Sequence, residues 1–168
     1  MARPALARTG ARMAAPLALM VAVMAFHNTP ASALSCVGDL PATREISSLK
    51  ARNIPLVAVE GRMTVATPYA PMRSPREAEA NPSATYHTKA QIEGVDVASG
   101  KPFQATIDIR RECTGPWCGS IASTSWALVL VQGERGGQYI EVGPCGGSIY
   151  ASYDRSAVAR CVRTGKCD

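Results

Sequence analysis

Histidine and long apolar runs are what this sequence has least of. The 168-residue chain has two histidines, and after residue 33 only His87 remains. A metal site supported by histidine therefore has a single candidate ligand of that type. No stretch after residue 33 is long and apolar enough to span a membrane, which takes about 20 residues. We expect no metal site, no cofactor and no transmembrane segment in this part of the chain.

A strong net charge is also missing once the N-terminus is set aside. Residues 1–33 contain three arginines and no acidic residue, whereas the remainder has 15 Lys and Arg against 13 Asp and Glu. Nucleic-acid binding needs a basic field, so nucleic acid is not an expected partner. The remainder is long enough for one hydrophobic core and too short for two ordinary domains.

The first 33 residues have the pattern of a secretory signal peptide. Arg3, Arg8 and Arg12 precede a 14-residue apolar run, Met13 to Phe26, and Ala31-Ser32-Ala33 follows. This order predicts cleavage after Ala33 and a periplasmic or secreted protein over residues 34–168. A lipid anchor at Cys36 is the disfavoured alternative, because Ala33 and Leu34 stand in the reverse of the usual lipobox order.

All six cysteines follow the predicted cleavage site, where an oxidising compartment favours disulfides. Six cysteines allow many connectivities. From the short spacings we favour the local pairs Cys113–Cys118 and Cys161–Cys167, which leaves Cys36–Cys145 to tie the N-terminus to the sheet. Trp117-Cys118-Gly119 resembles the start of a thioredoxin motif, but Ser120 and Ile121 stand where the motif continues to its second cysteine. A thiol-active Cys118 is therefore a minor hypothesis.

Five segments have strand patterns. They are 56–66, 86–97, 103–110, 126–131 and 138–142. Phe103, Ala105, Ile107 and Ile109 alternate with polar residues, as expected of a half-buried strand. The run 126–131 is continuously apolar and predicts a fully buried strand. Gly61 suggests a bend or bulge, and the change of apolar parity after Gly94 suggests another bulge.

The remaining segments predict little helix. Residues 34–53 form a polar lead-in with at most one helical turn at 47–52, and the Pro-rich segment 67–85 is predicted as a long loop. Residues 113–125 form a disulfide-bearing loop. Asp154 is an expected N-cap for a helix that ends at Gly165. Five strands and one terminal helix predict a mainly β protein, a small five-stranded OB-like Greek-key barrel, with a two-sheet sandwich as the alternative.

Several features resemble exported bacterial relatives of the netrin-like module of the tissue inhibitors of metalloproteinases. These are Cys36 near the mature N-terminus, the strand VAVEGRM, Cys118-Gly119 before the strand ALVLV, and Cys145 after the next strand. The resemblance implies an OB-fold. Metalloprotease inhibition would need the chain to begin at Cys36, but Leu34 and Ser35 precede it and Gly38 replaces a second cysteine.

A catalytic site has weak support. No G-x-S-x-G nucleophile elbow occurs, and the Gly-rich segment 143–147 lacks the Lys and Ser/Thr of a phosphate loop. An envelope hydrolase would use His87 or a pair among scattered acids, namely Asp96, Asp108, Glu112, Glu134, Glu141 and Asp154. A small basic surface patch could form from Arg110, Arg111 and Arg135.

The favoured hypothesis is a binding module for another envelope or extracellular protein, with no enzymatic activity. Its candidate surface combines the loops 67–85 and 113–118. The expected binding residues are Tyr69, Met72 and Trp117, because exposed aromatic side chains on loops often anchor interfaces.

Overall fold

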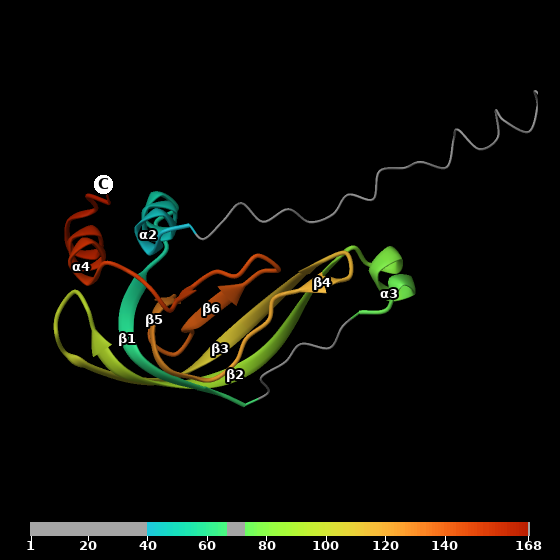
Figure 1. Ribbon diagram of the computed structural model, residues 1–168, viewed down its shortest axis with the longest axis horizontal. Helices are drawn as coiled ribbons and strands as arrows, with labels where there is room; N and C mark the ends of the chain where they lie inside the picture. The colour runs from blue at the N-terminus through green and yellow to red at the C-terminus, as the bar shows by residue number, and fades with distance from the viewer. Residues whose placement is uncertain (1–39, 67–72, 168) are drawn as a thin grey trace, which may run out of the picture. The chain divides into compact units, whose positions relative to one another are not determined.

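The computed structural model describes residues 40–66 and 73–167. Five strands form a closed barrel: β1 (Leu56–Val65), β2 (Ser83–Asp96), β3 (Pro102–Thr114), β5 (Thr124–Gln132) and β6 (Tyr139–Val142). Strand β1 pairs with both β2 and β5, and β3 pairs in parallel with β6 (Figure 1). This closure confirms the expected OB-like barrel. The five strand predictions are confirmed, although β2 and β3 are longer than expected.

Two short strands extend this sheet. Strand β4 (Trp117–Cys118) pairs with β3, and β7 (Ile149–Tyr150) pairs with β5. The first falls inside the predicted loop 113–125, where it turns part of that loop into a tight hairpin.

The barrel interior is filled by alternate residues of the strands. The buried cluster includes Val59, Met63, Ile92, Ile107, Ile109, Val129 and Ile140. Because successive side chains of a strand point to opposite faces, the intervening residues point outward. The polar residues of β2 and β3, such as Lys89 and Gln104, are accordingly exposed.

A second apolar layer covers part of the outer surface of the barrel. Leu128 and Leu130 of β5 point outward and pack with Ile46 of helix α2 (Ala42–Ala51) and Val158 of helix α4 (Arg155–Thr164). The two helices lie next to each other (Figure 1). Residues 127–132 are therefore buried from both sides, which explains the continuous apolar run.

Helix α2 was not expected from the sequence, which predicted at most one turn at 47–52. Its buried residues Ala42, Ile46 and Leu49 follow helical spacing. Short isolated helices are marginal in water, so packing against the barrel stabilises this one. Helix α4 is confirmed, with Asp154 accepting a hydrogen bond from the Ala157 N–H and Gly165 in the left-handed conformation at its end.

The predicted long loop 67–85 is also partly wrong. Residues Pro75–Ala80 form helix α3, and β2 begins at Ser83. Ser74 and Glu77 form a capping box, and the hydrogen bonds of Ser74 lower the pKa of the Glu77 carboxyl. Residues 67–72 lie outside the described part of the chain.

Gly61 and Gly94, where the sequence suggested bends or bulges, face each other in the β1–β2 pair. The β1–β5 pairing shifts register between Gly61 and Met63, which confirms the expected irregularity there. At Gly94 no bulge forms, because both ladders of β2 keep their register through it. Gly94 instead faces Gly61 in close contact. The parity changes because Val97 belongs to the outer apolar layer under the helices.

Within the described residues, the structure shows the two expected local disulfides, Cys113–Cys118 and Cys161–Cys167. Cys36 lies outside the described residues, so the predicted pair Cys36–Cys145 cannot be followed there. No cysteine of the described part is free. The predicted signal peptide, residues 1–33, also lies outside. Within residues 40–66 and 73–167, no helix has the length and hydropathy needed to cross a membrane.

Candidate binding surface at the end of the β2–β3 hairpin

The structure joins the two loops that the sequence singled out. Arg73, just before α3, is 5% exposed, and its guanidinium donates to the carbonyl of Gly115 at 3.0 Å and to that of Glu77 at 2.7 Å. It also donates to the carbonyl of Asn81. The Gly115 N–H in turn donates to the carbonyl of Pro82 at 2.8 Å. These bonds fix α3 to the turn between β3 and β4.

Trp117 follows this turn as the first residue of β4 and is 46% exposed. Its strand is held by the Cys113–Cys118 disulfide and by a 2.9 Å hydrogen bond from the Gly119 N–H to the Glu112 carbonyl. The backbone under the indole is therefore cross-linked, while almost half of the residue's surface remains open. Tyr69 and Met72, the other two expected binding residues, lie outside the described residues.

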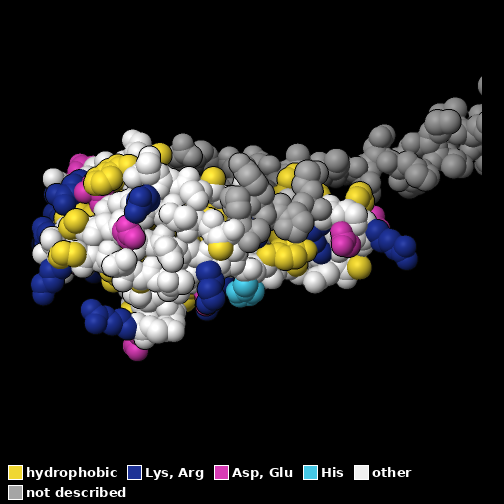
Figure 2. Space-filling model, turned by 90° about the horizontal axis from the view of Figure 1, so that it is seen from below, with side chains coloured by type: hydrophobic (Ala, Val, Ile, Leu, Met, Phe, Trp, Pro, Cys, Tyr) yellow, Lys and Arg dark blue, Asp and Glu magenta, His cyan; other side chains and the backbone are white. Residues whose placement is uncertain are grey.

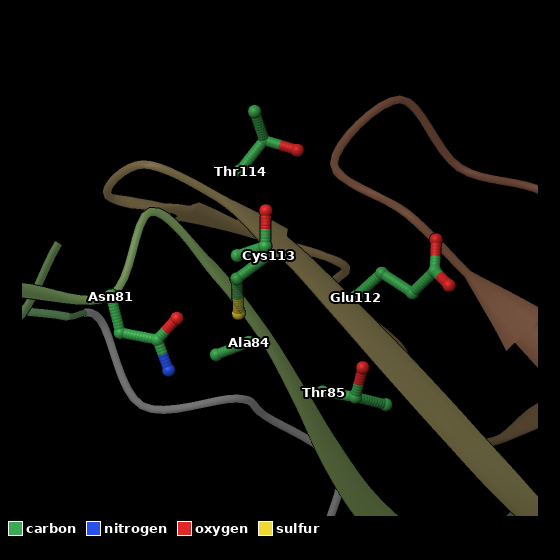
Figure 3. A pocket seen from close by; sticks show the side chains of 7 residues that line it. Asn81, Ala84, Thr85, Glu112, Cys113 and Thr114 are labelled. Carbon is green, nitrogen blue, oxygen red and sulfur yellow. The ribbon is translucent and has the colours of Figure 1, made fainter.

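A shallow hollow of about 510 Å³ lies beside this turn (Figure 3). Its lining is mostly polar and includes one carboxylate. The lining residues are Asn81, Ser83, Ala84, Thr85, Glu112, Cys113 and Thr114. Hydroxyl and amide groups can both donate and accept hydrogen bonds, so the hollow suits a polar ligand group.

The prediction that Arg111 belongs to a basic surface patch is wrong. This residue shares the inward face of β3 with Ile109 and Cys113 and is only 3% exposed. Its Nε and Nη1 are buried and have no hydrogen-bond partner. Arg110 points outward instead, where it stacks on the Tyr139 ring at 3.5 Å and approaches Glu141 at 3.6 Å.

Three of the candidate catalytic residues, His87, Asp108 and Glu141, lie close to Arg110 on the outer face formed by β2, β3 and β6. Asp96, Glu134 and Asp154 lie elsewhere, in or beside turns or at the start of α4. His87 is exposed on β2 opposite Arg110. Asp96 accepts hydrogen bonds from the Ala98 N–H and the Ser99 hydroxyl in the β2–β3 turn. Asp108 pairs with Lys89 at 3.0 Å, which holds the pKa of its carboxyl below the usual value. The described residues gather no group of three or more metal-ligating side chains.

The other predicted acids have different surroundings. Asp154 caps α4, Glu141 pairs with Arg110, and Glu112 lines the hollow. Glu134 and Arg135 are exposed in the turn between β5 and β6. Basic and acidic side chains both appear on the face shown in Figure 2, together with separate hydrophobic patches.

A second exposed tryptophan was missed. Trp126 is 62% exposed, although the sequence placed it in a fully buried strand. It shares the outward face of β5 with Leu128 and Leu130, but the helices cover only those two. Burial on β5 begins at Ala127, one residue later than expected. The polar residue Ser125 beside Trp126 was the available sequence signal for this.

We compared the chain with known proteins. No protein-family model, curated protein or solved structure matches it. The geometry of the described residues therefore carries the functional argument.

Proposed function

We propose that this protein is a secreted or periplasmic, disulfide-stabilised binding module for another envelope or extracellular protein. The observation that carries this proposal is the exposed indole of Trp117 beside a turn cross-linked by Cys113–Cys118 and bound to α3 through Arg73. A rigid aromatic side chain loses little conformational entropy on binding, so it is an effective interface anchor.

The surroundings of Trp117 support an interface. The hollow beside it offers hydroxyl, amide and carboxylate groups at its rim, and protein interfaces commonly combine an aromatic anchor with a polar periphery. The signal-peptide pattern and the two disulfides support the compartment.

Site-specific cross-linking tests this proposal. Thr114 lines the hollow, and replacing it leaves Trp117 in place. A photoreactive amino acid at this position should capture a defined protein in the envelope or the medium. The same probe at Gln104, exposed at the other end of β3, is the matched control.

The captured partner is then titrated against purified variants. Trp117→Ala should weaken its affinity about 30-fold, which corresponds to about 2 kcal/mol. Trp126→Ala should leave the affinity unchanged. Capture at Gln104 but not at Thr114, no capture at either position, or equal binding by Trp117→Ala would each contradict the proposal.

A further inference from the structure

The outer face around Trp126 combines an aromatic ring with fixed polar groups. Trp126 lies on β5 just beyond the part of the strand that α2 and α4 cover. The Trp126 N–H donates to the hydroxyl of Thr124, two residues earlier in the same strand, at 3.3 Å. The open indole surface is thus an accessible flat platform.

Beside this platform, hydrogen bonds link Glu60 of β1 to Tyr153 and to Arg155 of α4. Glu60 is paired with Leu128, so Trp126 lies only two residues along β5 from the position opposite this carboxylate. The Tyr153 hydroxyl donates to Glu60, and Arg155 Nε donates to the other oxygen of the same carboxylate at 2.9 Å. Side chains that restrain one another in this way are already ordered before a ligand arrives.

The charges near the ring are balanced. Glu60 pairs with Arg155, and Arg62, the next outward residue of β1, pairs with Glu93 at 2.6 Å. Because each carboxylate already has a cation beside it, neither an anionic nor a cationic ligand gains a net attraction. These paired charges border Trp126, which is 62% exposed.

We propose that this face binds a neutral saccharide. The C–H-bearing face of a pyranose ring is flat and apolar and can stack on the Trp126 indole. The ring hydroxyls lie at its edge, where Glu60 can accept and Arg155 can donate hydrogen bonds. The site uses neither Trp117 nor the hollow, so it stands independently of the protein-binding surface.

Intrinsic fluorescence provides a direct test because the chain has two tryptophans. In the Trp117→Phe variant, emission reports on Trp126 alone. The probes are three neutral trisaccharides, namely chitotriose, cellotriose and maltotriose, at concentrations up to ~20 mM, since weak sugar binding has dissociation constants of about 1 mM. At least one should shift the emission to shorter wavelength and saturate.

Substitutions then assign the polar contacts. Glu60→Gln and, separately, the more exposed Arg155→Met should each weaken binding about tenfold in the Trp117→Phe background. Glu141→Gln is the matched control, because Glu141 also pairs with an arginine but lies on β6. In a Trp126→Phe variant, the emission of Trp117 should not respond.

Each outcome of these titrations either supports or contradicts the saccharide site. A saturable response that depends on Glu60 and Arg155 supports the site. No saturable response to any of the three sugars, an unchanged affinity in both variants, or a response that Trp117 alone reproduces would overturn it. None of these results bears on cross-linking at Thr114.

Discussion

Arg110 and Arg111 are adjacent in sequence and opposite in environment. The Arg110 guanidinium stacks on Tyr139 and pairs with Glu141 at the surface. The Arg111 guanidinium lies inside the barrel with Nε and Nη1 unpartnered. A buried charge without a partner destabilises a fold, because desolvation is not offset by hydrogen bonds.

We therefore expect Arg111→Met to increase the free energy of unfolding by about 2 kcal/mol, since it removes that desolvation cost. Arg110→Met should decrease it by no more than about 1 kcal/mol, the usual range for an exposed ion pair and a cation–π contact. Urea unfolding followed by circular dichroism measures both values. A less stable Arg111→Met protein would contradict a net desolvation cost at this residue.

At the scale of elements, the close pairing of β1 with β2 depends on two glycines that face each other, Gly61 and Gly94. A Cβ added at Gly94 would lie 2.3 Å from the carbonyl oxygen of Glu60, and one added at Gly61 would lie 2.2 Å from that of Glu93. These are backbone atoms of paired strands, so they cannot move aside without breaking the ladder.

Gly94→Ala should therefore lower the free energy of unfolding by about 3 kcal/mol or more, as substitutions that force a backbone shift do. Gly137→Ala is a suitable control, because its added Cβ would meet nothing closer than 4.0 Å. It should change stability by less than about 0.5 kcal/mol. Thermal unfolding compares the two; similar midpoints would refute the close-packing explanation.

For the whole molecule, two tyrosines connect the helical layer to the barrel through carboxylates. Tyr150 of β7 donates to Glu45 of α2, and Tyr153 donates to Glu60 of β1. Burial, followed by the hydrogen bond and charge of Glu60, raises the pKa of Tyr153 from 10.0 to about 12. Burial and Glu45 also raise the pKa of Tyr150.

A raised phenol pKa means that the folded state holds the proton more tightly than the unfolded state. The resulting stability is complete below pH 10 and, for Tyr153, is lost as the pH rises from about 10 to about 12. Denaturant unfolding at pH 9 and pH 11 should show a smaller loss for Tyr150→Phe/Tyr153→Phe than for the unsubstituted protein. An identical loss in both proteins would remove these tyrosines as the cause.

Parts of the candidate binding surface could be predicted from local sequence signals. The short spacings predicted both local disulfides, and Trp117 was expected to be an exposed aromatic residue on the disulfide-bearing loop. The contact between Arg73 and Gly115 spans 42 residues and had no such signal. Arg111 was placed wrongly although the alternation of Ile107 and Ile109 implies that residue 111 also points inward.

The sequence by itself determined the strands, the local disulfides and the capped helix α4, because alternation, spacing and caps are short-range properties. Only the tertiary structure decided which strand faces are covered. Parallel pairing of β3 with β6 closes the barrel, and packing stabilises α2. The exposure of Trp126 follows from where that helical layer ends. Alternation shows which residues share a face, but burial depends on what packs against that face from elsewhere in the chain.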